Sequence, residues 1–376
     1  MSELLKSIDQ IPNPCFVIDE ELFVKNMLTL KKVEDVSGCE ILCALKGFSM
    51  WEMFSKMTNY ISGGTASSLN EAKLINEKMG RKAHSCFVTY LEEEFSEVQE
   101  ISSHLSFNSI SQFNRFKKKL DGSIKYAFRI NPQFSSVSFD KYNPCAEGSR
   151  FGVTEQDLPK TLPKQISGLH FHTLCESSAK DLEDLLKKIE AKFGHLLEQA
   201  SWVNLGGGHH ITKPGYDTEL LCEIIKGFRE KYNIDVYLEP GEAIGLNTGY
   251  LVSKIEDVVK NGYETTAILN VSFAAHMPDC LEMPYKPNII TELNEGVEIT
   301  LGGNTCMSGD YVRGFKFNAT PLIGDIIVFK DMMHYTFVKT SFFNGVKHPS
   351  LGLWNDQSGF KLLKEFSYLD FKYRLS

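Results

Sequence analysis

The 376-residue sequence has no apolar run that approaches the roughly 18 residues of a membrane-spanning helix. Its first residues lack the basic start and the long apolar stretch of a secretory signal peptide. The nine cysteines are scattered and contain no C-x-x-C pair, which favours reduced, mostly buried thiols over a disulfide framework. The formal net charge is −8, so nothing favours nucleic acid, although a cationic small molecule would be tolerated. We therefore expect a cytoplasmic globular protein with a small-molecule ligand and no membrane or nucleic-acid partner.

Short β-rich runs alternate with helix-like segments through the first two thirds of the chain. This alternation predicts a TIM-like (β/α)8 barrel of class α/β, which we place at residues 20–250. A long connection rich in Ser, Asn and Pro follows residue 130, and such loops are often functional. The expected strands are 41–45, 60–62, 85–89, 105–107, 125–130, 167–171, 202–205 and 236–238, and the clearest helices are 68–79, 91–101, 180–197 and 218–232.

The pattern changes after about residue 250. Segments 265–271, 298–301, 325–329 and 335–340 cluster β-branched and aromatic residues, and Gly302–Asn304 and Asn344-Gly345 look like turns. We therefore expect a C-terminal β domain over residues 251–376. The apolar segment 15–18 predicts a strand that residues 1–19 contribute to the same domain.

Polar residues follow the expected barrel strands in a regular way. Lys46 ends the first strand run, Arg129 lies at the end of another, His170 and His172 alternate along a third, and Glu239 follows the last. A triple glycine, Gly206–Gly208, follows strand seven. Because a parallel barrel gathers the carboxyl ends of its strands on one face, where active sites lie, we expect these residues to line one pocket.

Each of these residues also has an ordinary structural interpretation. An isolated lysine is usually solvated, a triple glycine is often a flexible turn, and a histidine in a strand is usually part of the core. In an apolar pocket, however, a lysine amine has a lowered pKa and forms a Schiff base. Bare glycine N–H groups after strands seven and eight bind phosphate. A zinc site is conceivable, but no standard ligand spacing appears and we expect no metal; its ligands would come from His170, His172, Cys175, His209 and His210.

Together these segments resemble the pyridoxal-phosphate decarboxylases of the alanine racemase-like fold, known as fold type III, which include ornithine, arginine and diaminopimelate decarboxylases. The resemblance extends over nearly the whole chain. Within the group, the sequence is most similar to the carboxynorspermidine/carboxyspermidine decarboxylases. The segments that carry it are Lys46, Arg129-Ile-Asn-Pro, Ser149–Val153, Gly168–Glu176, Gly206–Gly208, Glu239–Ala243, Met277–Tyr285, Gly303–Tyr311, Tyr335 and Phe343–Gly345.

The resemblance implies a pyridoxal 5'-phosphate enzyme that converts carboxynorspermidine or carboxyspermidine to norspermidine or spermidine in polyamine biosynthesis. It implies that Lys46 holds the cofactor covalently, that His172 stacks on its ring, and that Glu239 keeps the ring nitrogen protonated. It also implies a homodimer with shared active sites, in which Cys306 of the partner subunit protonates the carbanion and Arg150 pairs across the interface. The remaining cofactor-binding residues implied are Arg129, Gly207, Gly208 and Tyr335.

A long polyamine needs acidic partners for its distal ammonium groups. The candidates are Glu242, Asp279, Glu282 and Asp310, each of which could equally be a solvated surface residue. Glu242 stands where the wider group has a phosphate-binding arginine, and Leu174-Cys175 replaces the group's Gly-Ser, so the phosphate would depend on the glycine loop and Tyr335. The alternatives are a diaminopimelate or other basic amino-acid decarboxylase of the same fold, and, more distantly, a non-catalytic decarboxylase-like binding protein.

Overall fold

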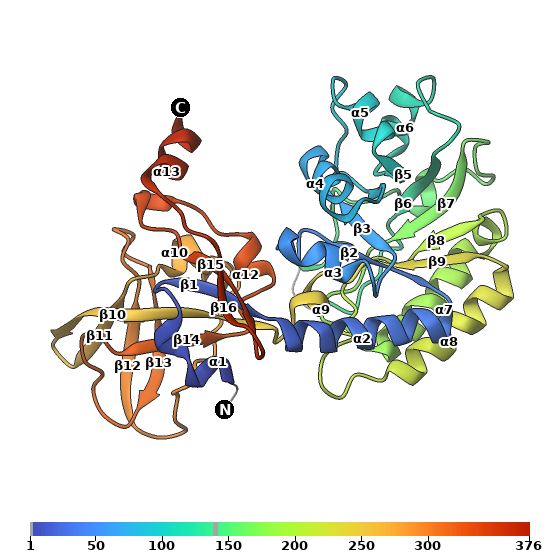
Figure 1. The fold of residues 1–376 in the computed structure, drawn as a ribbon. Coiled ribbons are helices and arrows are strands. Elements are labelled where there is room, and N and C mark those ends of the chain that lie inside the picture. Colours follow the sequence, from blue (N-terminus) through green and yellow to red (C-terminus); the bar gives the residue numbers. More distant parts are fainter. Residues whose placement is uncertain (1–2, 138–141) are drawn as a thin grey trace. The chain divides into compact units, whose positions relative to one another are not determined.

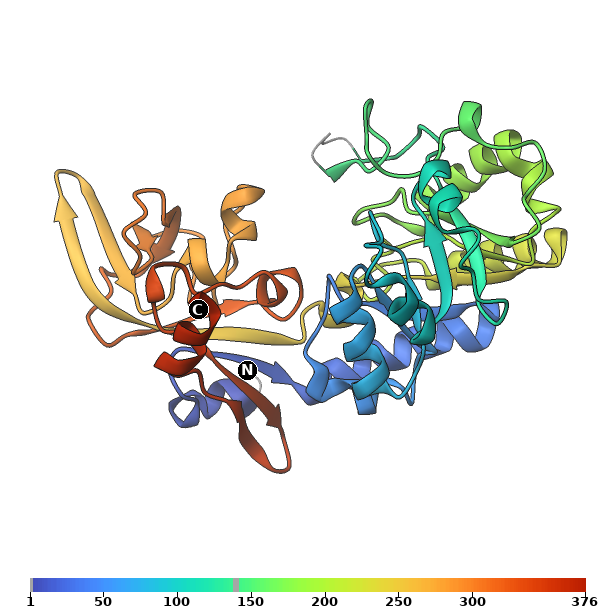
Figure 2. The same ribbon diagram turned by 90° about the horizontal axis from the view of Figure 1, so that it is seen from above.

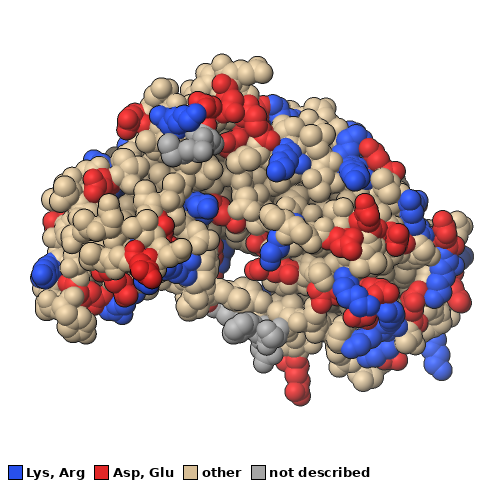
Figure 3. All heavy atoms as spheres, turned by 90° about the horizontal axis from the view of Figure 1, so that it is seen from below, with Lys and Arg blue, Asp and Glu red and all other residues tan. Residues whose placement is uncertain are grey.

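The computed structural model describes residues 3–137 and 142–376. The chain divides into two compact units, one comprising Asn26–Ile244 and the other comprising Met1–Lys25 with Gly245–Ser376. In the part of the chain that the structure describes, no helix combines the length and apolar character needed to cross a membrane. Acidic and basic side chains lie interspersed over much of the face drawn in Figure 3.

The first unit is a closed barrel of eight parallel strands arranged in chain order (Figure 1). The last strand pairs with the first and closes the barrel, since Glu40 pairs with Tyr237 and Ile41 with Leu238. This arrangement confirms the predicted (β/α)8 fold. The strands are β2 (Glu40–Ala44), β3 (Gly63–Ala66), β4 (Ala83–Ser85), β5 (Ser102–Phe107), β6 (Lys125–Ile130), β7 (Ile166–Phe171), β8 (Trp202–Asn204) and β9 (Asp235–Leu238).

Helices lie on the outside of this barrel, and α7 and α8 run side by side (Figures 1 and 2). The sequence explains why α7 forms, because Ser178 and Asp181 make a capping box at its start and a leucine-rich stripe faces the strands. The helices that lie wholly or mostly in this unit are α2 (Glu20–Ser37), α3 (Phe54–Met57), α4 (Leu69–Met79), α5 (Phe95–Glu100), α6 (Ile110–Phe116), α7 (Ala179–Leu197), α8 (Thr218–Tyr232) and α9 (Glu242–Gly245), with 3-10 turns at Trp51–Met53 and Glu155–Asp157.

Two predicted strands were wrong in position. The strand expected at 60–62 begins only at Gly63, because the chain uses a glycine pair where helix α4 packs closely: a Cβ on Gly64 would lie 3.0 Å from Ile75. The strand expected at 85–89 instead ends at Ser85, and the β-branched residue Val88 beyond it is exposed. In both cases the prediction depended on residue type alone. It was wrong because glycine is depleted in strands and valine is enriched in them.

The predicted long connection lies between β6 and β7. Among residues 131–137 and 142–165, the structure has no α-helix. Partway along, it returns to the barrel, where Val153 forms a parallel bridge with Ile130. Gly152 makes this return possible, since its φ is +78° and a Cβ there would lie 2.9 Å from the backbone of Asn131. The side chain of Asn108 holds the same turn through the Gly152 N–H.

The second unit is built on an eight-stranded sheet in the order β13-β12-β11-β10-β1-β15-β16, with β14 also paired to β10. Strand β1, from the start of the chain, is antiparallel to β10 and parallel to β15. The strands are β1 (Cys15–Asp19), β10 (Gly249–Asn261), β11 (Glu264–Leu269), β12 (Val297–Gly302), β13 (Tyr311–Phe317), β14 (Ile326–Lys330), β15 (Ser350–Asn355) and β16 (Gly359–Lys364).

The strand expected at 335–340 was wrong, because Tyr335–Val338 is the short helix α12. Its backbone closes helical bonds from Val338 N–H to His334 C=O and from Lys339 N–H to Tyr335 C=O. The other helices of this unit are α1 (Glu3–Lys6), α10 (Phe273–His276), α11 (Asp279–Glu282) and α13 (Tyr368–Leu375), with 3-10 turns at Ile8–Gln10 and Phe343–Gly345.

Candidate active site

Lys46 lies just beyond the carboxyl end of β2, at the mouth of the barrel, and its Nζ is 3.2 Å from Nε2 of His172. The other ring nitrogen of His172, Nδ1, accepts a hydrogen bond from the Gly207 N–H at 3.1 Å. A neutral imidazole that accepts at Nδ1 carries its proton on Nε2, so His172 donates to the amine of Lys46. That arrangement requires an amine with a free lone pair.

Electrostatics agree with a neutral lysine and a neutral histidine. Burial and the charge of Arg129 lower the pKa of Lys46, and Glu239 only partly opposes them. Burial, Lys46 and Arg129 hold the pKa of His172 well below its usual value. The barrel mouth therefore contains an amine that holds its proton less tightly than an exposed lysine does, which favours its use as a nucleophile.

Glu239 follows β9 and is a buried, ionised carboxylate. Asn204 Nδ2 donates to its Oε1 at 2.7 Å, and His170 Nε2 lies 3.4 Å from its Oε2. The hydroxyl of Thr65 donates to the same carboxylate. Burial alone would raise the pKa of Glu239, but the charge of His170 and these hydrogen bonds outweigh it and lower the pKa to about 2.

The triple glycine follows β8 and hydrogen-bonds to residues that follow β7 and β9. Gly206 and Gly208 have φ values of +73° and +86°, and a Cβ on Gly208 would lie 2.2 Å from the backbone carbonyl carbon of Leu174. The Gly206 N–H is bonded to Asn204 Oδ1 and the Gly207 N–H to His172. Of the three glycine amides, only that of Gly208 makes no hydrogen bond within the described residues. The loop thus orients His172 as well as leaving one N–H for a ligand.

Arg129 lies at the end of β6 and is almost fully buried. Its guanidinium covers the ring of Phe151 at 4.3 Å, and Arg150 lies 4.4 Å from the same ring. Arg129 contributes to the lowered pKa values of both Lys46 and His172. The structure therefore brings Lys46, Arg129, His172, the glycine loop and Glu239 together, as the sequence predicted.

Glu242 begins α9, and its carboxylate lies 3.2 Å from Nε2 of His210. Glu242 stands where the wider group has a phosphate-binding arginine. It thus contacts a histidine that follows the glycine loop. His170, His172 and Glu239 also offer ligand atoms within 4.8 Å of one another. All three side chains already contact protein groups, namely Ser106, Lys46, Gly207 and Asn204.

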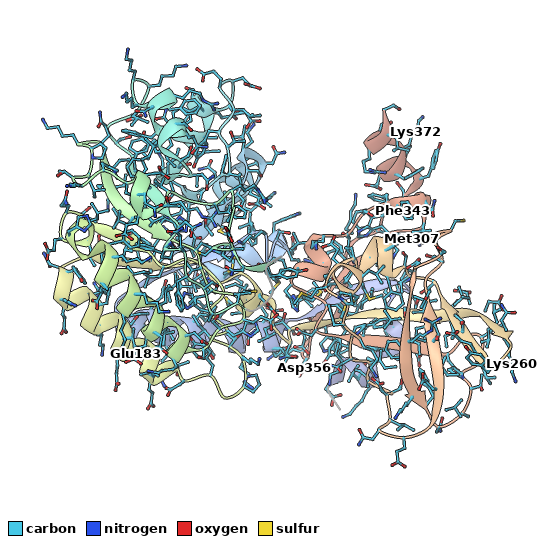
Figure 4. The ribbon with its side chains drawn as sticks, turned by 180° about the vertical axis from the view of Figure 1, so that it is seen from behind. Glu183, Lys260, Met307, Phe343, Asp356 and Lys372 are labelled. Atoms are coloured by element: carbon cyan, nitrogen blue, oxygen red, sulfur yellow. The ribbon has the colours of Figure 1, made fainter. Side chains whose placement is uncertain are left out.

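The remaining predicted residues belong to the sheet unit. Cys306 is exposed, and its backbone N–H donates to Asn344 Oδ1 at 2.9 Å. The loops that carry these two residues lie together, as the neighbouring labels of Met307 and Phe343 in Figure 4 indicate. Asp310 is buried and stabilises the Cys306 loop, since its oxygens accept hydrogen bonds from Ala274 N–H and from the backbone and hydroxyl of Thr305.

The acidic candidates of this unit differ in the protein groups that their carboxylates contact. Asp279 accepts hydrogen bonds at Oδ2 from the hydroxyls of Tyr285 and Thr336, both at 2.7 Å. Its Oδ1 is buried and has no hydrogen-bond partner among the described residues. Glu282 forms an ion pair with Lys339. Tyr335 is the first residue of α12 and is partly buried.

Three residues that surround Glu239 were missed by the sequence interpretation: Thr65, Asn204 and Cys86. Cys86 follows β4 as Lys46 follows β2, and it lines the same narrow pocket as Asn204 and Glu239. The same rule that singled out Lys46 would have found it, had a cysteine not looked like an ordinary buried apolar residue.

The barrel, the neutral lysine amine at its mouth and the attached sheet unit define a fold type III pyridoxal-phosphate enzyme. Residues 15–333 match the family described as pyridoxal-dependent decarboxylase, C-terminal sheet domain. The chain belongs to this family of decarboxylases.

Curated relatives match nearly the whole chain. A carboxyaminopropylagmatine decarboxylase from Synechocystis sp. is 40% identical over 98% of this chain and 96% of its own. A carboxynorspermidine/carboxyspermidine decarboxylase from Campylobacter jejuni is 40% identical over 97% of this chain and 99% of its own. The crystal structure of carboxynorspermidine decarboxylase from Campylobacter jejuni, complexed with norspermidine, superposes with a TM-score of 0.90 at 39% identity, covering 97% of this chain and 100% of that one.

Proposed function

We propose that this protein is a pyridoxal 5'-phosphate-dependent carboxy-lyase that decarboxylates carboxynorspermidine or carboxyspermidine to norspermidine or spermidine. The observation that carries the proposal is the neutral Lys46 amine held by His172, in a chain about 40% identical throughout to decarboxylases of such carboxy-polyamines. The function would place the protein in polyamine biosynthesis.

The residues at the barrel mouth fit the cofactor. Lys46 offers a nucleophilic amine to an aldehyde, and the ionised Glu239 offers an oxygen to a protonated ring nitrogen. A glycine loop that no Cβ could occupy offers the Gly208 N–H to a phosphate, with Gly207 beside it and Tyr335 as the proposed second phosphate ligand. When bound, pyridoxal phosphate supplies an electron-withdrawing ring that stabilises the carbanion left by the loss of CO2.

The chain's own residues then have defined tasks. His172 hydrogen-bonds Lys46 and presents a flat ring whose orientation the Gly207 N–H fixes. A carboxylate departs best when its bond stands perpendicular to the cofactor plane, so a fixed plane favours decarboxylation over competing reactions. Arg129 adds a buried positive charge to the mouth of the barrel. We propose that Cys306, contributed by the partner subunit of a homodimer, returns the proton to the substrate carbon.

Among the acidic candidates, Asp279 is best prepared to receive a substrate ammonium. Its unpartnered Oδ1 gains a hydrogen bond when a cation arrives, whereas its Oδ2 stays fixed by Tyr285 and Thr336. Glu242 and Glu282 would have to share their charge with His210 and Lys339. For Asp310 the contacts favour a different task, that of holding the Cys306 loop.

A second candidate substrate is carboxyaminopropylagmatine. The observation that favours it is the Synechocystis relative, which is as similar to this chain as the Campylobacter relative is. An agmatine end carries a guanidinium, which pairs with a carboxylate through two hydrogen bonds rather than one.

The test is CO2 release from purified protein with carboxynorspermidine, carboxyspermidine, carboxyaminopropylagmatine, diaminopimelate and ornithine, compared as kcat/KM. We expect carboxynorspermidine and carboxyspermidine to lead. The two differ by one methylene, which is worth only about 1–3 kcal/mol, so both must be measured. Preference for diaminopimelate or ornithine would reject the substrate assignment, and preference for carboxyaminopropylagmatine would replace it with the second candidate.

The covalent role of Lys46 is tested separately. Borohydride reduction followed by peptide mapping should place the mass of the cofactor on the peptide that contains Lys46, and Lys46→Ala should abolish that adduct. An unmodified Lys46 peptide from fully loaded protein would contradict the assignment. Catalytic silence of the loaded wild-type protein with every substrate would instead favour a binding protein of the same fold.

A further inference from the structure

Cys306, the proposed proton donor, is exposed and lies in the loop between β12 and β13 of the sheet unit. Within the described residues it makes one hydrogen bond, from its backbone N–H to Oδ1 of Asn344 at 2.9 Å. The preceding residue, Thr305, is held separately, because its N–H and hydroxyl donate to the carboxylate of Asp310. The direction in which the Cys306 side chain leaves this loop therefore depends on Asn344.

Asn344 has a backbone conformation that few side chains tolerate. Its φ is +55° and its ψ is +7°, in the left-handed region that residues other than glycine rarely adopt. Asparagine and aspartate enter this region more readily than most residues, and both carry an acceptor oxygen on Cγ. Glycine adopts the conformation without strain but has no acceptor. The position therefore combines a left-handed turn with a side-chain contact that glycine could not make.

The turn that carries Asn344 packs against the C-terminal segment of the chain. The next residue, Gly345, has a φ of +67°, and a Cβ there would lie 3.1 Å from the ring of Phe371 in α13. On the other side of the turn, the ring centroid of Phe342 lies 5.8 Å from that of Phe366 and 6.5 Å from that of Phe371. Aromatic side chains from the C-terminal segment thus hold the turn before and after Asn344.

The return of the proton requires the thiol to lie close to the substrate carbon. In that step the S–H bond of Cys306 breaks, and a C–H bond forms with the electron pair left by the departing CO2. The thiolate then takes its next proton from water. Because a proton is transferred only within hydrogen-bond reach, a donor whose loop is free to move should slow this step without weakening the binding of substrate or cofactor.

We propose that Asn344 is a positioning residue for Cys306: its side-chain oxygen holds the Cys306 backbone so that the thiol keeps one direction, and Phe371 of the C-terminal helix holds the turn that carries Asn344. In this role Asn344 acts through Cys306 and not on the reacting atoms. The consequence for turnover rests on the proposed function, in which Cys306 returns the proton. The contact itself does not, because both residues belong to the same sheet unit.

The first measurement is hydrogen exchange of the Cys306 N–H in holoenzyme labelled with 15N-cysteine, whose signal is assigned by its loss in Cys306→Ser. Asn344→Gly keeps the backbone conformation and removes the acceptor, so we expect it to speed this exchange by about five-fold or more. Asn344→Asp keeps an acceptor oxygen and should exchange at nearly the wild-type rate. The matched control is Asn233→Gly at the left-handed C-cap of α8, where φ is +49°, which should leave the exchange unchanged.

The second measurement separates kcat from KM. We expect Asn344→Gly to lower kcat on the order of ten-fold, with KM within about two-fold and cofactor content unchanged, and Asn344→Asp to recover most of kcat. Phe371→Ala should change the exchange rate and kcat in the same directions as Asn344→Gly, but by smaller factors. Tyr373→Ala, on the same helix at a residue that is 72% exposed, should change neither.

Equal exchange of the Cys306 N–H in the wild type and in Asn344→Gly would overturn the contact. Faster exchange with unchanged kcat, or a kcat that Asn344→Asp does not recover, would overturn the positioning role. Wild-type behaviour of Phe371→Ala would overturn the part assigned to the C-terminal helix. If Cys306→Ser keeps the wild-type kcat, or if no substrate is turned over, the proposed function fails, while the exchange rates still decide whether Asn344 holds Cys306.

Discussion

The side chain of His172 connects Gly207 to Lys46: it accepts the glycine N–H at Nδ1 and faces the lysine amine with Nε2, at 3.1 and 3.2 Å. One backbone amide thus fixes the tautomer of a histidine, and that tautomer requires a lysine with a free lone pair. The glycine loop therefore orients the partner of the proposed nucleophile, in addition to its proposed contact with phosphate.

His172→Phe should separate stacking from hydrogen bonding. Phenylalanine keeps a flat ring but neither accepts from Gly207 nor donates to Lys46. We expect the variant to retain bound cofactor, with kcat reduced on the order of 10- to 100-fold because the ring plane and the lysine amine are no longer fixed. His172→Ala, which removes both functions, should lower cofactor content as well. Equal cofactor loss in the two variants would argue against a stacking role.

Gly208→Ala should displace the loop, because the added Cβ meets backbone atoms of Leu174 at 2.2 Å and the residue has φ +86°. We expect cofactor affinity to fall by about 10-fold or more, measured by equilibrium titration. The matched control is Gly227→Ala in α8, where a Cβ meets nothing within 4 Å. That substitution should stabilise the protein by about 0.5–1 kcal/mol and leave cofactor affinity unchanged.

The parts of the fold that followed from the sequence are those where burial and residue type agree. Strand β6 and helix α8 were placed correctly because an unbroken apolar run and a clear helical stripe specify them. Strand β3 contains Gly63 and Gly64 and was displaced, and the aromatic and β-branched residues of α12 were expected to form a strand. Those outcomes depend on tertiary packing, which residue type does not encode.

Some features of the candidate site likewise followed from the sequence, and others did not. Lys46, His172 and Glu239 were predicted as site residues because each lies at or just beyond the end of a barrel strand, and the family resemblance supplied their proposed roles. The use of the Gly206 and Gly207 amides inside the protein follows from backbone angles that the sequence does not give. Cys86 escaped notice because only its neighbours in space distinguish it from a buried structural thiol.

The stacked histidines His84 and His104 inside the barrel should make the protein sensitive to acid. Their ring centroids are 3.8 Å apart, and burial lowers the pKa of His104 to about 3 and that of His84 well below normal. Above about pH 6.5 both are neutral in the folded and the unfolded chain, and they add no pH dependence. As the pH falls from there towards 3, only the unfolded chain takes up protons, so stability is lost.

Each such histidine costs up to about 2 kcal/mol of stability at pH 5. His104→Phe, which keeps an aromatic ring in the stack, should therefore flatten the decrease of Tm between pH 7 and 5. His195→Gln, on the exposed part of α7, should leave the slope of Tm against pH as it is in the wild type. An unchanged slope in His104→Phe would mean that other groups cause the acid sensitivity.

Asp279→Asn should weaken substrate binding selectively. The amide keeps an oxygen for the hydroxyls of Tyr285 and Thr336 but removes the negative charge offered at the unpartnered Oδ1. Loss of one partner of a desolvated charge pair costs on the order of 2–5 kcal/mol, so KM should rise about 30-fold or more. Cofactor content and Tm should stay near their wild-type values, because Asp279 is not among the proposed cofactor residues. If the variant left KM unchanged for all three carboxy-polyamines, the distal ammonium would have to be bound elsewhere, with Glu242 the next residue to substitute.

Glu282→Gln tests the same idea at a more exposed carboxylate. Its ion-pair partner Lys339 is itself exposed to solvent, so the pair neutralises the charge of Glu282 only in part. We expect a KM increase that far exceeds any loss of cofactor, and a smaller one than in Asp279→Asn. Glu295→Gln, at an exposed position of the same unit, is the control and should change neither quantity. If Glu282→Gln lowered cofactor content and substrate affinity equally, the residue would be structural.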